Sequence, residues 1–231
     1  METTLANARY ERKYTLAGIS TEQVINLVRL HPALFYEPYP ERTVNNIYLD
    51  TPDLRHYLEH SNGASRRTKV RVRWYGRFGG PIARPVLEFK SRDGVVGGKE
   101  SFPFPAFDLN GSFPRSALVE AQQHPGIPEA ARWQLAGLRP SLGNRYRRRY
   151  FCTADRSVRL TVDWALEFIE VAGAHQHLRQ LSPENRLVVV ELKYPPEVAD
   201  RAVEIARQFP FQLTRCSKYV MGVDLLPVPI H

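Results

Sequence analysis

The stretch Lys69-Val70-Arg71-Val72-Arg73-Trp74-Tyr75-Gly76 decides the fold class of this chain. Cationic and apolar side chains alternate in it with a period of two, as they do on a β-strand with one polar and one buried face. The cations of the stretch therefore share one face of a sheet, and the valines point toward a core. The pattern predicts a half-buried antiparallel strand rather than a helix.

The same alternation recurs in three Glu-x-Lys triplets, which occupy residues 11–13, 88–90 and 191–193. On a strand, positions i and i+2 project to the same side, so each triplet presents a carboxylate and an ammonium together. Only six of the 32 basic residues are lysines, and half of these six fall in the triplets. We therefore expect the charged side of the sheet to be a functional feature.

Strands dominate the pattern, and turn signals containing glycine separate several of them. We predict strands over residues 9–16, 43–49, 69–75, 86–90, 99–104, 145–153, 157–162, 165–171 and 186–194. Ser20-Thr21-Glu22 is expected to cap a helix that runs through Leu30, and Thr51-Pro52-Asp53 is expected to open one that runs through His60. Pro128 and Pro196 stand near the starts of two further helices. No linker or repeat divides the chain, so we expect one α+β domain over residues 1–231 with a core at about 9–226.

Composition narrows the class of protein further. The chain has a formal net charge of +8, which points to an anionic partner such as nucleic acid, nucleotide or polyphosphate. Apolar runs fall short of the roughly 20 residues of a membrane span, and no secretory signal is visible. Cys152 and Cys216 are too few for a disulfide framework, so we expect reduced thiols and a cytoplasmic protein.

Two arrangements of the charged strands fit the alternation equally well. In the first, an open antiparallel sheet shows its charges to water, and cross-strand ion pairs contribute about 0.2–1 kcal/mol each. In the second, the sheet closes into a barrel with helices outside, and the charges line the interior with water, metal ions or a polyanion. The residues alone leave both arrangements open.

An ordered set of motifs resembles the VTC domain, the polyphosphate-polymerase branch of the triphosphate tunnel metalloenzymes and a CYTH-like family. The motifs that carry the resemblance are Glu-Arg-Lys-Tyr at 11–14, Ile-Tyr-Leu-Asp-Thr at 47–51, the stretch at 69–76, Leu-Glu-Phe-Lys at 87–90, Arg-Tyr-Arg-Arg-Arg-Tyr-Phe at 145–151, Val-Arg-Leu-Thr-Val-Asp at 158–163, Val-Glu-Leu-Lys-Tyr at 190–194 and Ser-Lys-Tyr at 217–219. The resemblance implies an eight-stranded antiparallel β-barrel, a tunnel that binds triphosphate, with helices packed outside.

The resemblance also implies the site. Its phosphate-binding cations correspond to Lys13, Arg71, Arg73, Lys90, Lys99, Arg148, Arg159, Arg215 and Lys218. The residues that we expect to act in catalysis are Lys13, Arg71, Arg73, Lys90, Arg148 and Glu191. Arginine donates two hydrogen bonds to a phosphate, and lysine supplies a compact charge.

Carboxylates are the protein ligands that Mg²⁺ and Mn²⁺ prefer, so a Mn²⁺ or Mg²⁺ site is expected at Glu191 and, second, at Glu11. Glu88 and Asp163 are expected either to bind metal through water or to orient Lys90 and Arg159.

One departure from the family pattern bears on the reaction. The hydrolytic CYTH branch opens with Glu-x-Glu-x-Lys, whereas this chain has Arg9 at the first of these positions. Loss of that carboxylate favours transfer to a phosphate acceptor over hydrolysis. We therefore expect a metal-dependent phosphotransferase that moves the γ-phosphate of ATP onto polyphosphate.

The alternatives are a triphosphatase of inorganic or nucleoside triphosphate and a non-catalytic polyphosphate- or nucleotide-binding module. A nucleic-acid partner is not expected, because no known nucleic-acid-binding motif is present.

Overall fold

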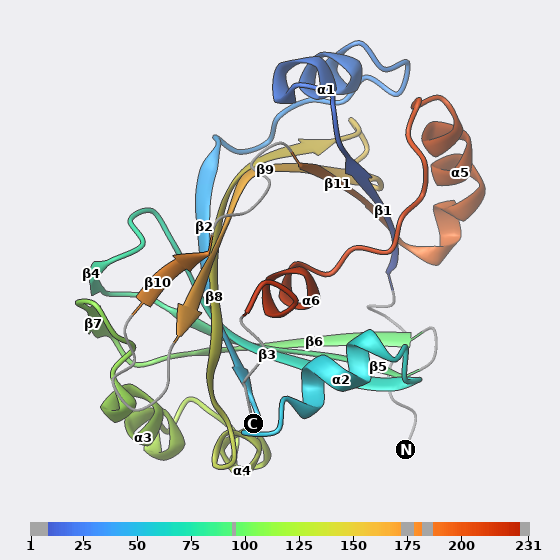
Figure 1. Ribbon diagram of the computed structural model, residues 1–231. Helices are drawn as coiled ribbons and strands as arrows, with labels where there is room; N and C mark the ends of the chain where they lie inside the picture. The colour runs from blue at the N-terminus through green and yellow to red at the C-terminus, as the bar shows by residue number, and fades with distance from the viewer. Residues whose placement is uncertain (1–8, 94–95, 172–177, 182–186, 227–231) are drawn as a thin grey trace. The chain divides into compact units, whose positions relative to one another are not determined.

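The computed structural model describes residues 9–93, 96–171, 178–181 and 187–226 (Figure 1). Its strands are β1 (Tyr10–Leu16), β2 (Arg42–Asp50), β3 (Arg66–Tyr75), β4 (Gly80–Ile82), β5 (Val86–Asp93), β6 (Val96–Pro103), β7 (Phe107–Leu109), β8 (Arg139–Cys152), β9 (Arg159–Val171), β10 (Leu178–Leu181) and β11 (Val188–Tyr194). Its helices are α1 (Thr21–Arg29), α2 (Arg55–Ser61), α3 (Arg115–Gln123), α4 (Glu129–Leu135), α5 (Ala199–Arg207) and α6 (Lys218–Val223), with a 3₁₀ turn at Pro196–Val198. None of the helices in this part of the chain is long and apolar enough to cross a membrane.

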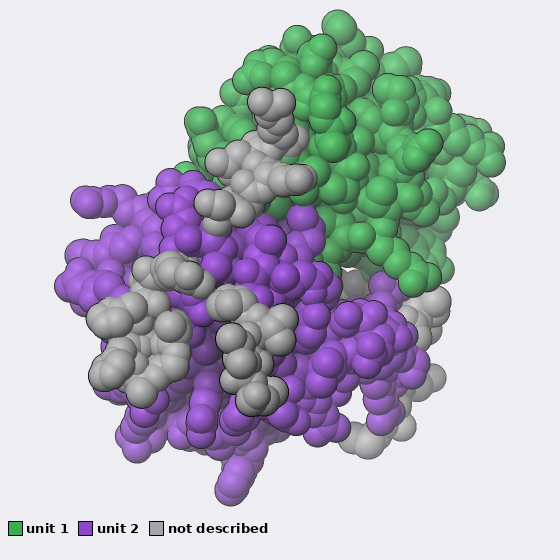
Figure 2. All heavy atoms as spheres, viewed as in Figure 1, with its two compact units in different colours: residues 1–43, 146–166, 184–217 green, residues 44–145, 167–183, 218–231 purple. Residues whose placement is uncertain are grey.

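Hydrogen bonds join the strands in the order β1-β11-β9-β8-β2-β3-β5-β6, and β10 pairs with β9. The short strands β4 and β7 form a separate pair. The chain folds into two compact units, which Figure 2 colours green and purple. Unit 1 contains residues 1–43, 146–166 and 184–217, and unit 2 contains residues 44–145, 167–183 and 218–231.

The apolar face of the sheet in unit 1 is covered by α1 and α5. Alternate residues of β11 and β9, such as Val190, Leu192 and Leu160, are buried with Val28 of α1 and Ile205 of α5 in one apolar cluster. Ser20 caps α1 by accepting a hydrogen bond from the backbone of Gln23, whose side chain accepts one from the Ser20 backbone. The opposite face of these strands keeps the charged residues.

Unit 2 has the same two-sided construction. Val70 and Val72 of β3 and Leu87 of β5 are buried in a second apolar cluster with Leu118 of α3 and Leu135 of α4. The helices therefore cover the face that the alternating valines predict, and Arg71 and Arg73 project to the other face. The predicted separation of charged and apolar faces is confirmed in both units.

Most predicted strands are confirmed with bounds that differ by one to three residues, and three larger differences occur. The strands predicted over 157–162 and 165–171 form one continuous element, β9, although Ala165 within it has a φ of 49°. The strand β8 begins at Arg139, six residues before the predicted start. The short strands β4, β7 and β10 were not predicted, and Arg186, the predicted first residue of β11, lies outside the described residues.

The start of α2 corrects one helix prediction. The run Thr51-Pro52-Asp53 was expected to open this helix, but α2 begins at Arg55 after Leu54 in the left-handed conformation. Its N-terminus is capped instead by the buried carboxylate of Asp50, which accepts hydrogen bonds from the backbone of His56 and Tyr57 at 2.8 and 2.9 Å. Thr51, from the run expected to open the helix, adds to this cap, because its hydroxyl accepts a hydrogen bond of 2.9 Å from the backbone of Arg55. The remaining part of the cap comes from Asp50, the last residue of the preceding strand.

Candidate functional site

The strands β3, β5 and β6 of unit 2 present a strongly basic surface, which we call the cationic face. Residues in register across these strands are Arg71 with Glu88, Lys69 with Lys90, and Lys90 with Lys99. The described side chains of this face comprise seven cations and one carboxylate: Arg67, Lys69, Arg71, Arg73, Lys90, Arg92, Lys99 and Glu88. Such an excess of fixed positive charge suits a polyanion.

Glu88 lies at the centre of the cationic face and organises three of its cations. Its carboxylate is 2.6 Å from Arg71 Nη2, 3.5 Å from Arg73 Nη1 and 2.6 Å from Lys99 Nζ, and the residue is only 4% exposed. Burial alone would raise the pKa of Glu88, but the three cations outweigh it and hold the pKa well below its ordinary value. Glu88 is therefore a fixed anion that orients these three expected phosphate ligands.

Two asparagines that the sequence did not single out extend this arrangement. Arg73 Nε donates a hydrogen bond of 2.9 Å to Asn46 Oδ1, and Asn46 Nδ2 donates one of 2.7 Å to Asn144 Oδ1. All three residues are buried. The sequence offered a weak signal, which is that Asn46 falls between Val44 and Ile47 in a predicted strand, where a buried polar group needs a partner.

The helix α6 packs on the polar side of β2 in unit 2. Tyr219 stacks on Tyr48 at 4.7 Å between ring centroids, and its hydroxyl donates a hydrogen bond of 2.5 Å to Asp50. Burial and the neighbouring Asp50 both raise the pKa of Tyr219, which keeps the hydroxyl protonated as the donor. Lys218, an expected phosphate ligand, is the first residue of this helix and is buried.

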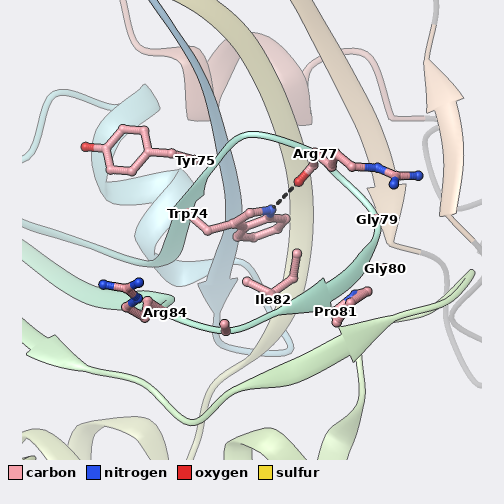
Figure 3. A pocket seen from close by; sticks show the side chains of 9 residues that line it. Trp74, Tyr75, Arg77, Gly79, Gly80, Pro81, Ile82 and Arg84 are labelled. Carbon is pink, nitrogen blue, oxygen red and sulfur yellow. Dashed lines mark hydrogen bonds between the residues drawn. The ribbon is translucent and has the colours of Figure 1, made fainter. Parts of the chain in front are cut away.

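A cavity of about 490 Å³ opens in unit 2 where β3 ends (Figure 3). Its lining includes Trp74, Ile82, Arg77 and Arg84, and the Trp74 indole N–H donates a hydrogen bond of 2.9 Å to the carbonyl of Arg77. In Figure 3 the ring of Tyr75 extends away from Trp74. Since Trp74 is 2% exposed, it is a core residue with little surface for stacking on a base. Neither arginine was among the residues expected to bind phosphate.

The paired strands β1 and β11 of unit 1 place two Glu-x-Lys triplets side by side in one sheet. Register pairs Glu11 with Lys193 and Lys13 with Glu191. Lys13 Nζ lies 3.4 Å from Glu11 Oε2 and 3.5 Å from Glu191 Oε1. Lys193 Nζ lies 3.2 Å from Glu11 Oε1 and 2.9 Å from Glu191 Oε2. Two carboxylates and two ammonium groups thus alternate in what we call the carboxylate–lysine cluster.

A buried ion pair adjoins this cluster. Arg148 of β8 donates two hydrogen bonds, of 2.6 and 2.7 Å, to Asp163 of β9, and its Nη2 is 3.9 Å from Glu191 Oε2. Burial alone would lower the pKa of Arg148, but Asp163 outweighs it and the pKa stays well above its ordinary value. Asp163 therefore orients Arg148, whereas the sequence suggested Arg159 as its partner.

The remaining expected residues of unit 1 are more exposed. Arg159, opposite Lys193 on the neighbouring strand, is exposed, as are Arg9 and Arg215. The segment around Arg215 runs beside β1, where Thr214 N–H bonds to the Lys13 carbonyl at 2.8 Å and Lys13 Nζ donates to the Cys216 carbonyl at 3.2 Å. Both cysteines are free thiols, as predicted.

Glu11 and Glu191 fit the donor requirement of a Mg²⁺ or Mn²⁺ ion. Such ions are bound by one or two carboxylates, and water and phosphate oxygens complete the coordination. Each of the two ammonium groups lies within 3.5 Å of both carboxylates, so the two carboxylates share one small region of unit 1. Among the described residues, no group of three or more His, Cys, Asp or Glu side chains could hold a metal. The protein therefore supplies only part of a coordination shell.

The antiparallel sheet, with helices on its apolar faces and charges on the other, defines a protein of the triphosphate tunnel fold. The model of the VTC domain family matches residues 8–227, and the chain belongs to this family. The resemblance and the α+β fold class expected from the sequence are both confirmed. A comparison with curated proteins found no match.

Solved structures share the fold at low sequence identity. A Vibrio parahaemolyticus protein described as a candidate adenylate cyclase has a TM-score of 0.52 at 12% identity, over 93% of this chain and 97% of that chain. A protein from Pyrococcus horikoshii has a TM-score of 0.51 at 11% identity, over 93% and 99% of the two chains. A Hippeastrum protein described as a candidate adenylyl cyclase with a dominant triphosphatase activity has a TM-score of 0.46 at 15% identity, over 95% and 98%. At these identities the likeness is one of fold alone.

Proposed function

We propose that this chain is a metal-dependent phosphotransferase that moves the γ-phosphate of ATP onto a polyphosphate chain. The cationic face of unit 2 is the observation that carries the proposal, because seven cations and only one carboxylate share this side of three strands. A triphosphate brings three to four negative charges, and this surplus of positive charge would bind it through several charge-assisted hydrogen bonds. Membership of the VTC domain family supports the same substrate class.

The chain's own groups would act by binding and positioning. Arg71 and Arg73, held by Glu88, would donate to phosphate oxygens, and Lys90 and Lys99 would add point charges. In unit 1, Lys13 and Arg148 would have the same role, with Arg148 oriented by Asp163. A terminal phosphate oxygen of the polyphosphate chain would attack the γ-phosphorus of ATP in line, so that one P–O bond forms, the β,γ P–O bond breaks and ADP leaves. This transfer needs no covalent intermediate with the protein, so positioning and charge stabilisation suffice.

Glu191 and Glu11 would hold the Mn²⁺ or Mg²⁺ ion, which when bound offsets negative charge on the transferring phosphoryl group. Arg159, Arg215 and Lys218 complete the proposed substrate-binding set. We also propose that these residues belong to a single functional domain over residues 1–231.

The test is incubation of the purified chain with ATP and Mn²⁺, followed by separation of the products on a polyacrylamide gel. Long polyphosphate supports the proposal. Free phosphate alone supports the triphosphatase alternative, and ATP binding without either product supports a binding module. A gel shift at physiological salt checks the nucleic-acid alternative, because electrostatic binding to nucleic acid falls steeply with salt.

Variants locate the activity. Glu191→Gln should lower turnover by more than about 100-fold, since even outer-shell partners of a metal are worth 10- to 100-fold. The double variant Arg71→Ala, Arg73→Ala should weaken binding of tripolyphosphate. Arg66→Ala is the matched control, because Arg66 lies on the same strand with its side chain exposed and paired to Asp93. Equal losses in the control and the double variant would place the phosphate elsewhere.

A further inference from the structure

The carboxylate–lysine cluster has no net charge before any metal arrives. Its four members are Glu11, Glu191, Lys13 and Lys193, and each ammonium contacts both carboxylates at 2.9–3.5 Å. This alternation follows from the sequence, because two antiparallel Glu-x-Lys triplets in register place each glutamate opposite a lysine. A divalent ion that binds these carboxylates would therefore lie close to two ammonium groups that repel it.

We infer that Lys193 is a resident counter-ion that keeps free divalent metal away from this carboxylate pair, so that metal binds only together with a phosphate chain. The inference rests on the proposed function and specifies how its site is regulated. Of the two lysines, Lys193 makes the closer contacts to both carboxylates, at 2.9 and 3.2 Å against 3.5 and 3.4 Å for Lys13. Its side chain is 32% exposed, so its ammonium group has room to move toward solvent or an incoming phosphate.

Two features of the cluster make the dependence on phosphate strong. The described residues include no third carboxylate, histidine or cysteine with which the pair could form a metal-binding group. Phosphate oxygens would supply the missing ligands, and their negative charge would attract the ammonium groups away from the carboxylates. A free metal ion brings no ligands except water, so it does not complete the coordination shell. Its positive charge also cannot attract the ammonium groups away from the carboxylates.

The test measures metal binding rather than activity. The full chain is dialysed to equilibrium against Mn²⁺ alone and against Mn²⁺ with AMP-PNP, an ATP analogue with a non-hydrolysable β,γ bridge. Protein-bound Mn²⁺ is then determined for the wild type and for Lys193→Met. We expect the variant to bind Mn²⁺ alone at least about tenfold more tightly than the wild type. With AMP-PNP present, both chains should bind Mn²⁺.

Controls separate charge at this position from charge in general. Lys193→Arg keeps the cation and should behave as the wild type. Arg207→Met removes an exposed cation of α5 and should leave Mn²⁺ binding unchanged. Lys193→Gln repeats the test if the methionine variant does not fold, as checked by circular dichroism. Glu191→Gln should remove the binding of Mn²⁺ alone that Lys193→Met gains, when the two substitutions are combined. With AMP-PNP present, Glu191→Gln should weaken Mn²⁺ binding by at least about tenfold, and the Mn²⁺ that remains is carried by nucleotide on the cationic face.

Two results would overturn the inference. The first is tight binding of Mn²⁺ alone by the wild type at an affinity that Lys193→Met and Lys193→Gln do not change. The second is absence of bound Mn²⁺ in every chain even with AMP-PNP, which would refute the metal site itself. Titration of tripolyphosphate without metal distinguishes this second result from failure of the whole proposed function, because binding to the cationic face does not need the metal.

Discussion

Replacement of Glu88 by glutamine tests whether this carboxylate is the counter-ion of the cationic face. The substitution keeps the size of the side chain and removes its charge, and it leaves Arg71, Arg73 and Lys99 without their anion. Breaking a buried ion pair costs about 3–5 kcal/mol when the remaining charge stays buried. The side chains of Arg71 and Lys99 are 20% and 52% exposed, so water recovers part of that cost. We expect a loss of about 2 kcal/mol in the free energy of unfolding.

The same substitution should strengthen binding of tripolyphosphate. A unit charge 4 Å away is worth about 1 kcal/mol even at the dielectric constant of bulk water, so removal of the Glu88 charge should tighten binding about fivefold or more. Thermal unfolding followed by circular dichroism should show a Tm lower by roughly 4–8 °C without ligand. Because a ligand at a given concentration stabilises the chain more when it binds more tightly, tripolyphosphate should raise the Tm of the variant more than that of the wild type.

Glu100→Gln is the matched control for this experiment. Glu100 lies on the adjacent strand β6, opposite Phe89 and exposed, so its charge does not belong to the cationic face. It should leave both the Tm and the affinity for tripolyphosphate nearly unchanged. Weaker binding of tripolyphosphate by Glu88→Gln, with the stability of the wild type retained, would refute the counter-ion argument. Orientation of the arginines would then matter more than the charge of Glu88.

Two further predictions concern stability. Gly222→Ala should destabilise the chain by about 1–3 kcal/mol in urea unfolding, because the new Cβ would overlap Leu142 and would lie 2.5 Å from Phe168; unchanged stability would show that α6 is not packed as described. His60 should make stability fall as pH falls from about 6.5 to about 3, because burial and Lys69 lower its pKa to about 3 while the unfolded chain takes up the proton near pH 6.5. Each pH unit in this window costs up to ~1.4 kcal/mol, and His60→Gln should flatten the dependence; an equally steep profile in the variant would assign it to other groups.

The sidedness of the strands was predictable from the sequence because it depends on local alternation alone. Because side chains of a strand alternate between its two faces, the stretch at 69–76 places Arg71 and Arg73 on one face and Val70 and Val72 on the other. No knowledge of neighbouring strands is needed for that inference. Both apolar clusters confirm it, since the valines are buried under helices.

Partners across strands were not predictable in the same way, because they depend on register between distant segments. Asp163 was expected beside Arg159, four residues away on its own strand, but it binds Arg148 of the neighbouring strand. The Asn46 bond to Arg73 likewise joins two strands whose alignment no local pattern contains. Residues that act through cross-strand contacts are therefore the ones that sequence reasoning missed.

The register between strands also explains why Glu-x-Lys triplets of the same pattern have different charged neighbours. Glu88 and Glu191 both belong to Glu-x-Lys triplets, yet Glu88 faces cations from β3 and β6, whereas Glu191 has a second carboxylate, Glu11, on the adjacent strand. A carboxylate outnumbered by three cations cannot attract a further cation, because its charge is already more than compensated. Glu191 also lies 3.9 Å from Arg148, but Asp163 balances the charge of that arginine. We therefore expect Glu11 and Glu191 to exchange their two lysines for a divalent ion once a phosphate draws the lysines away. The distribution of charge across strands, rather than the triplet itself, is therefore the reason why we propose the metal site at Glu11 and Glu191 and not at Glu88.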